Sequence, residues 1–216
     1  MKKVLFLLFL FLVSPVSAEN AIPFCTSLST KIHVRTKIGN PQYISQYSRT
    51  DFLKKAGIKT SAYTLGLTVA KPSVSVSATP FVHELLGQIC VGIEEIDVEV
   101  GYESLIVYID KKYAPSSCEY QTIKEHENYH VQVAQQAIPF FKPDIEKTVT
   151  QAVSKQVPRI VYSQNDVKPL LNQMVASVVD DVQPVLKHIS NKLAEKNAAI
   201  DTAEMYEATT AVCKNW

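Results

Sequence analysis

The sequence predicts an α+β fold, in which a β-rich N-terminal part packs on a helical C-terminal part. Residues 30–110 are rich in β-branched and aromatic side chains and contain stretches of alternating apolar and polar residues, which is typical of strands. Residues 116–213 instead place apolar residues three or four positions apart, as amphipathic helices do. No repeat or long linker interrupts the chain, so we expect a single domain over residues 19–216.

Residues 1–18 have the pattern of a secretory signal peptide. Two lysines precede an apolar run over residues 4–13 that is too short to cross a bilayer, and small residues at 16–18 fit a cleavage site. We therefore expect the mature chain to begin at Glu19 and to be exported, either to a bacterial periplasm or to the medium, without a stable membrane anchor. The alternative is an uncleaved N-terminal anchor.

Strands and turns are expected throughout the β-rich part. A hairpin is expected over residues 96–109, because residues 96–100 alternate between apolar and acidic side chains, residues 105–109 are apolar, and Gly101 starts the stretch between them. The other expected elements are, in order, a strand at 32–34, a turn at 39–41, a strand within 60–70 and a turn at 71–73.

Four helical segments are expected in the C-terminal part. Ser116 and Glu119 have the spacing of a capping box, which predicts that the first helix starts there, and Pro139 is expected to end it. The remaining expected segments are residues 144–157, a helix capped by Asn165 or Asp166 and interrupted near Pro184, and a last helix over residues 192–213.

The chain contains four cysteines, an even number that favours two disulfides in an exported protein. Three pairings are possible, and we favour Cys25–Cys90 with Cys118–Cys213. A cysteine metal site is the alternative, but the spacings are wide and no C-x-x-C pair is present.

The charge balance argues against a nucleic-acid-binding or polybasic membrane surface. The formal net charge of the whole chain is +1, and loss of the two signal-peptide lysines would leave −1. The sequence does not indicate an oligomeric state.

The stretch His126-Glu127-Asn128-Tyr129-His130 forms an H-E-x-x-H pattern within the first expected helix. Two histidines four positions apart lie on one helical face and can bind one metal ion. Zinc suits imidazole ligands and lowers the pKa of a bound water to about 7. Because Glu127 can take the proton of that water, the expected chemistry is hydrolysis of a carbonyl bond, most simply a peptide bond.

A catalytic zinc site needs a third protein ligand. The compact metzincin pattern would place a histidine six residues after His130, where this chain has Gln136, so we expect a carboxylate from the last helix instead. Glu207 continues the apolar stripe of Leu193 and Ile200 at heptad spacing, a position that is costly for an unpaired carboxylate.

We therefore favour Glu207 as the third ligand, with Glu204 as the alternative and Asp201 as a hydrogen-bonding partner of the ligands. The remaining interpretation is that both glutamates face solvent on a frayed last helix.

Other residues have weaker signals. Tyr129, Tyr206 and His188 are conceivable donors to a transition state, although Tyr129 is more typical of an ordinary aromatic and His188 of a solvated histidine. The apolar run at residues 105–109 would either be an edge strand that binds an extended peptide or a plain core strand.

The motif resembles that of zincin-type zinc metallopeptidases. More narrowly, the stretch from Cys118 through Lys124-Glu125-His126-Glu127 to His130 is similar to a family of exported bacterial proteins described as zinc-dependent proteases, which share a β-rich start, a cysteine before a K-x-H-E-x-x-H helix and a helical end. The chain departs from that family at Tyr129, where glycine is frequent, and after Asp201, where the family has a histidine. The resemblance implies a zincin-like fold and a Zn²⁺ site.

The function expected from these features is an exported zinc protease that acts on a peptide or protein substrate, with Glu127 activating a zinc-bound water. The alternative is a zincin-like binding or structural protein of the bacterial envelope that lacks turnover. A further interpretation is a disulfide-bonded envelope protein in which the pattern occurs by chance.

Overall fold

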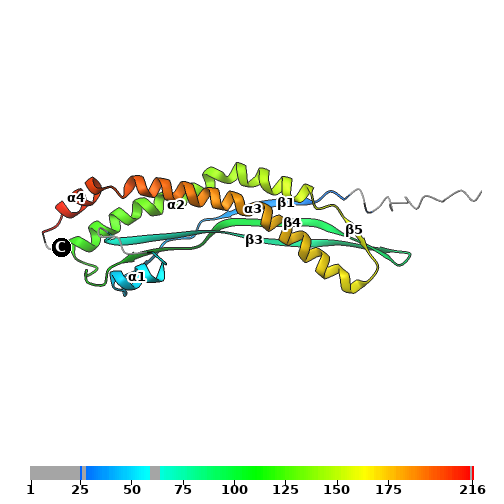
Figure 1. Cartoon of the computed structure of the whole chain (residues 1–216), viewed down its shortest axis with the longest axis horizontal. Coiled ribbons are helices and arrows are strands. Elements are labelled where there is room, and N and C mark those ends of the chain that lie inside the picture. Colours follow the sequence, from blue (N-terminus) through cyan, green and yellow to red (C-terminus); the bar gives the residue numbers. More distant parts are fainter. Residues whose placement is uncertain (1–24, 26–27, 59–63, 215) are drawn as a thin grey trace, which may run out of the picture.

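The α+β prediction is confirmed by the computed structural model, which describes residues 25, 28–58, 64–214 and 216. A mixed five-stranded sheet forms the N-terminal part, and the two longest helices run along one side of it (Figure 1). The predicted signal peptide and the predicted start at Glu19 lie outside the described residues.

The sheet is built around β4, a strand of 22 residues that pairs on both of its edges. One edge pairs antiparallel with β3, which has 20 residues and no other partner strand among the described residues. The other edge takes three shorter strands in turn, of which β1 and β2 are parallel to β4 and β5 is antiparallel. The bounds are β1 Lys31–Lys37, β2 Gln42–Ile44, β3 Gly66–Leu85, β4 Gln88–Ile109 and β5 Arg159–Val161.

The predicted hairpin over residues 96–109 is wrong, because β4 runs through this stretch without a turn. The turn lies at Leu86 and Gly87, whose positive φ angles of 52° and 76° are those of a tight hairpin turn. Gly101 has a different role: an added Cβ would lie 2.0 Å from the carbonyl oxygen of Lys37, so glycine lets β1 approach β4.

The turn predicted at residues 71–73 is also wrong, since these residues continue β3. A register shift between Lys71 and Pro72 accommodates the proline, and β3 is a strand whose second edge has no partner strand among the described residues. Proline is tolerated in such a place because its missing N–H breaks no ladder bond.

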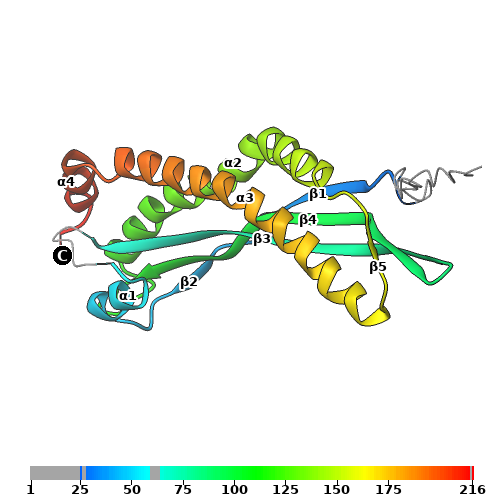
Figure 2. The same ribbon diagram turned by 45° about the vertical axis from the view of Figure 1, so that its right-hand side comes forward.

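Two helices of 37 residues each, α2 (Cys118–Ser154) and α3 (Gln164–Ile200), cover the sheet and run antiparallel. The prediction that Pro139 ends the first helix is wrong, and Pro184 likewise lies inside α3. Figure 2 shows both helices bent, as expected for helices with internal prolines. Burial of apolar side chains on both sides of each proline offsets the local cost of about 3 kcal/mol.

The helix starts differ from prediction by a few residues. Ser117 caps α2 by accepting a hydrogen bond from the Tyr120 N–H, and Ser163 caps α3. Short helix α1 (Arg49–Lys55) was not expected; it begins at a capping box of Ser48 and Asp51.

The predicted last helix over residues 192–213 is interrupted. Helix α3 ends at Ile200, Asp201 is its C-terminal cap, and Thr202 caps the separate helix α4 (Ala203–Ala211). This break decides the geometry of the candidate site.

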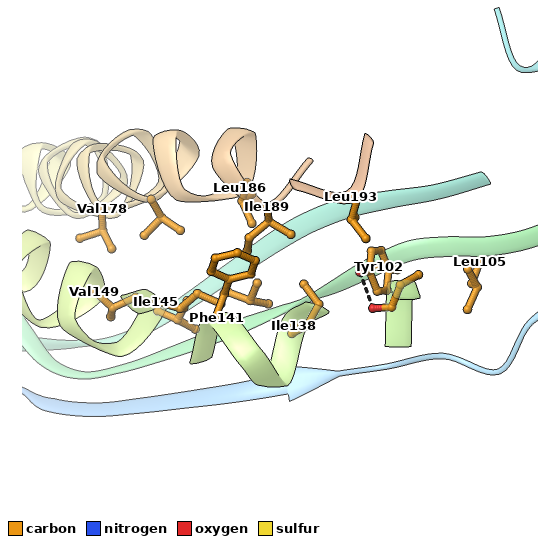
Figure 3. Close-up of a cluster of buried hydrophobic side chains, with 14 of the residues drawn as sticks. Tyr102, Leu105, Ile138, Phe141, Ile145, Val149, Val178, Leu186, Ile189 and Leu193 are labelled. Carbon is orange, nitrogen blue, oxygen red and sulfur yellow. Dashed lines mark hydrogen bonds between the residues drawn. The ribbon is translucent and has the colours of Figure 1, made fainter. Parts of the chain in front are cut away.

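The core fills the space between one face of the sheet and helices α2 and α3. Figure 3 shows Phe141 and Ile145 of α2 beside Leu186 and Ile189 of α3, all of them buried. Within this layer, the hydroxyl of Tyr102 on β4 donates a hydrogen bond to the carbonyl of Ala134 on α2 at 2.7 Å (Figure 3). Burial raises the pKa of Tyr102 to about 12.

Both predicted disulfides are confirmed: Cys25–Cys90 joins the N-terminal segment to β4, and Cys118–Cys213 joins the start of α2 to the end of the chain. They are consistent with an oxidising compartment. Within the described residues, none of the helices combines the length and hydropathy needed to cross a membrane.

Candidate metal centre

His126 and His130 lie one turn apart on the buried face of α2. The two residues are 6% and 5% exposed, and their Nε2 atoms are 3.3 Å apart. Since residues four positions apart share a helical face, the local sequence alone brings these two nitrogens together. The structure thus brings these two predicted residues together.

Asp201 is the third member of the group. Its Oδ1 lies 3.1 Å from Nε2 of His126 and 3.1 Å from Nε2 of His130. The three residues form the one cluster of candidate metal ligands found among the described residues. Asp201 reaches the histidines because α3 ends one residue earlier and the chain then turns towards α2.

The distances within this group fit a tetrahedral zinc. Zinc binds imidazole nitrogen and carboxylate oxygen at about 2.0–2.2 Å, which places neighbouring ligand atoms about 3.3–3.6 Å apart. The three separations of 3.1, 3.1 and 3.3 Å differ from this by a few tenths of an ångström. Two imidazoles and one carboxylate are also a donor set that zinc prefers, so the residues present fit the metal that the motif implies.

A hydrogen bond at the ring nitrogen that faces away from the cluster orients His130. Nδ1 of His130 is 3.1 Å from Oδ1 of Asn197, one turn before the end of α3. Such a bond leaves Nε2 free to hold a metal. Nδ1 of His126 is buried and has no hydrogen-bond partner among the residues that the structure describes.

His130 and Asp201 favour each other's charged forms. Burial raises the pKa of the Asp201 carboxyl, but hydrogen bonds from His126 and His130 outweigh it and hold this pKa well below the ordinary value. Burial likewise lowers the pKa of His130, and its contacts with Asp201 and Glu127 reverse the shift and raise it. In the metal-free protein, a positive imidazolium beside a carboxylate therefore stabilises the cluster.

Tyr206 on α4 covers the same group. Its hydroxyl donates to Oδ1 of Asp201 at 3.1 Å, and its ring centroid is 5.4 Å from that of His126. Burial and the nearby Asp201 carboxylate raise the pKa of Tyr206, so its hydroxyl keeps its proton.

Glu127 is 3% exposed and is held by strand β3. The hydroxyl of Thr68 donates to Oε2 of Glu127 at 2.8 Å. An added Cβ on Gly66 would lie 2.7 Å from Oε1, so the glycine leaves room for the carboxylate. Burial is the largest influence on Glu127 and raises its pKa, against the opposing effect of His130 and Thr68.

The arrangement does not bring the predicted glutamates to the histidines. Glu207 and Glu204 are both exposed and belong to no candidate ligand group of the described residues, so the geometry favours Asp201 in the place expected for Glu207. The heptad argument assumed one continuous last helix, and the break at Asp201 and Thr202 turns Glu207 away from the stripe. Threonine within an apolar helical pattern is a capping signal that could have revealed this break.

The remaining predicted residues have ordinary surroundings. Tyr129 is 54% exposed, and His188 packs edge-on against Phe141 with ring centroids 5.4 Å apart. Residues 105–109 belong to β4 and pair with β3 on one edge and with β2 on the other, so they form a core strand and not the edge strand considered as a peptide-binding site. The strand that borders the site is β3.

A cleft runs along β3 over the site. A cavity of about 220 Å³ is lined by Gly66, Glu127, Asp201 and Tyr206 among others. A second cavity of about 240 Å³ shares His130, Thr68 and Asn197 with it and continues between β3 and α3.

No protein-family model, curated protein or solved structure matches this chain. The assignment of a function therefore depends on the motif and on the geometry of the site.

Proposed function

We propose that this protein is an exported zinc-dependent peptidase whose metal ligands are His126, His130 and Asp201. The observation that carries the proposal is the convergence of three ligand atoms within 3.3 Å of one another, next to a buried glutamate of the same helix turn. The two disulfides support an oxidising location outside the cytoplasm.

Zinc in such a site polarises a carbonyl group and lowers the pKa of water to about 7. Glu127 would receive the proton of the attacking water, because its raised pKa makes it a stronger base than an exposed glutamate. Thr68 holds the Glu127 carboxylate in place, and Asn197 holds His130.

Tyr206 is suited to stabilise the developing negative charge. Its hydroxyl stays protonated, faces Asp201 and lines the cleft. A tyrosine hydroxyl is one of the donors that can stabilise such an oxyanion, and Tyr206 would do so by exchanging its hydrogen bond to Asp201 for one to the reacting oxygen.

The cleft suits an extended peptide. Consecutive residues from Gly66 to Ala70 of β3 line its two cavities, and that edge of β3 has no strand partner within the described part of the chain. A substrate strand could pair with the β3 backbone there, which would place a peptide carbonyl over the histidines.

A second candidate is a metal-binding protein of the envelope without turnover. The observation that favours it is the burial of Glu127, a residue that is 3% exposed and whose carboxylate already accepts a hydrogen bond from Thr68. A glutamate that water cannot reach would hold the helix to β3 and catalyse nothing.

Replacement of Glu127 by glutamine separates the two. Purified residues 19–216 are expected to contain about one zinc per chain and to cleave unfolded protein substrates. Glu127→Gln is expected to keep the zinc and lose at least about 100-fold in cleavage rate, the usual range for removal of a general base. Equal cleavage by Glu127→Gln and wild type, or cleavage by neither, contradicts the peptidase proposal; the latter result with zinc bound supports the second candidate.

The ligand set is tested by a pair of carboxylate variants. Asp201→Asn is expected to weaken zinc binding at least about 100-fold, because it removes an anionic ligand, whereas Glu207→Gln is expected to leave it unchanged. Affinity would be measured by competition with a coloured chelator. The reverse order of effects would restore Glu207 as the ligand.

A further inference from the structure

Helix α4 and its flanking residues are weakly attached to the rest of the protein. None of the residues of α4 is buried, although Tyr206 contacts His126 and the preceding Asp201 contacts both histidines. A helix of nine residues without a buried face gains little from packing and is marginal by itself. Something else must hold this segment over α2.

The contacts of the segment follow one stripe of α2. Cys118, Thr122, His126 and His130 are each four positions apart and therefore share a helical face. The C-terminal segment runs along that stripe in the opposite direction, and Figure 1 shows α4 beside the start of α2.

Each contact along the stripe is direct. Asp201 bonds to both histidines, and the ring of Tyr206 packs 5.4 Å from that of His126. Cys213 then meets the far end, where its Sγ is bonded to Cys118 and lies 3.4 Å from the hydroxyl of Thr122. Beyond Cys213, the ring of Trp216 packs edge-on against Tyr113.

We propose that Cys118 and Cys213 are positioning residues of the metal centre: their disulfide holds Asp201 and Tyr206 against His126 and His130. The inference rests on the proposed metal site and adds a condition for its assembly. Closing the bond converts two thiols into one disulfide, and their two protons and two electrons pass to a disulfide-type oxidant, which is reduced to a dithiol. The site is complete only after that step, and an oxidising compartment favours it.

The physical basis is local concentration. With the bond closed, residues 201–213 are confined between α3 and the first turn of α2, so the Asp201 carboxylate stays near the histidines. With the bond open, the Cys213 end of this segment is no longer attached to α2. The entropy cost of ordering Asp201 then opposes metal binding. Loss of groups that orient ligands typically weakens metal binding 10–100-fold, and we expect a loss in this range.

The two disulfides provide a matched experiment. Cys118→Ser with Cys213→Ser opens the bond beside the site, and Cys25→Ser with Cys90→Ser opens the other, which joins the N-terminal segment to β4. Zinc affinity would be measured for both double variants by chelator competition at a temperature where circular dichroism shows each to be folded. The first is expected to bind zinc at least about tenfold more weakly than wild type, and the second to bind it as wild type does.

Equal affinity of the first variant and wild type, or an equal loss in both double variants, would overturn the proposal. If the first variant does not fold, insertion of three glycines after Ala211 keeps the disulfide and loosens only its connection to α4. That variant is also expected to bind zinc more weakly, and unchanged affinity would count against the inference.

Failure of the metal site itself has a different signature. If wild-type protein binds no zinc, the proposed function fails, and hydrogen exchange of the α4 amides in metal-free protein still reports the tether. Faster α4 exchange in the first double variant alone supports the positioning role, and unchanged exchange overturns it.

Discussion

Glu127 depends on two small features of β3, the hydroxyl of Thr68 and the missing side chain of Gly66. Glu127 is 3% exposed, and a buried carboxylate is unfavourable unless its oxygens have hydrogen-bond partners; the Thr68 hydroxyl at 2.8 Å is such a partner for one oxygen. Gly66 leaves the space for the other. Two residues with no metal-binding chemistry of their own therefore determine where the proposed base lies.

Gly66→Ala tests this packing. The new methyl would lie 2.7 Å from Oε1 of Glu127 and 2.8 Å from Cγ2 of Ile123, so we expect a loss of stability of about 1–3 kcal/mol and reduced peptide hydrolysis. Thermal unfolding and cleavage rate would be measured together. Gly39→Ala is the control, because a Cβ there meets nothing within 4 Å, and equal behaviour of the two variants would contradict the prediction.

The histidine–aspartate cluster predicts a pH dependence for the metal-free protein. The pKa of Asp201 is lowered from its ordinary 3.8, so its contribution to stability is present above that value and is lost as pH falls towards the folded-state pKa. The pKa of His130 is raised from 6.5, so its contribution is present below 6.5 and is lost as pH rises through the folded-state pKa. Both contributions are present between about pH 4 and 6.5.

The stability difference between wild type and Asp201→Asn is therefore expected to be largest in that window and to shrink on both sides of it. Urea unfolding in the presence of a chelator, repeated from pH 3 to 9, measures it. A difference that does not vary with pH would mean that the two groups are not coupled.

At the scale of elements, the ends of helices and strands determine the site more than their middles do. The break between α3 and α4 brings Asp201 to the histidines, and the start of α2 carries the disulfide to Cys213. The turn between β3 and β4 starts the register of this strand pair, and two register shifts, between Thr79 and Pro80 and between Lys71 and Pro72, then decide which residues of β3 face α2.

That turn contains a residue that is poorly suited to it. Leu86 has a φ of 52° and is 95% exposed, so its side chain gains no burial in a backbone region that favours asparagine or glycine. Leu86→Asn would give the Asn-Gly sequence preferred in tight hairpins, and we expect an increase in stability of about 0.5–1 kcal/mol. The melting temperature would measure it. A lower value would show that Leu86 makes a stabilising contact.

At the scale of the whole molecule, the proposed zinc site joins segments that are far apart in the chain. Its ligands come from α2 and from the C-terminal cap of α3, about 70 residues later, and its base is held by β3. The two disulfides add connections over 65 and 95 residues. A metal bound at this junction would stabilise the arrangement of helices and sheet.

Zinc is accordingly expected to raise the melting temperature. A ligand that binds only the folded state at 100 times its dissociation constant adds about 2.7 kcal/mol. Thermal unfolding with zinc and after chelation measures this, and His126→Ala is expected to unfold at one temperature under both conditions. An equal shift in wild type and His126→Ala would indicate nonspecific binding.

The predictable features of the fold are those that depend on local patterns. Alternation over residues 96–100 correctly indicated a strand, and the capping-box spacing of Ser116 and Glu119 placed the start of a helix within one residue of its position. The hairpin turn was misplaced because Gly101 is as typical of a close backbone approach as of a turn, and the partner that approaches, β1, lies more than 60 residues earlier.

The sequence by itself indicated the α+β class and placed the histidine pair and its glutamate on one helix, because spacing along one helix face is a local property. It left three cysteine pairings open, and the structure contains the one that we favoured. The tertiary structure decided the rest of the site. Asp201, and not Glu207, lies beside the histidines because a helix ends there, and Thr68 and Gly66 contact Glu127 because β3 packs on α2. Such contacts join residues 59 to 75 positions apart, and only the packing of whole elements brings them together.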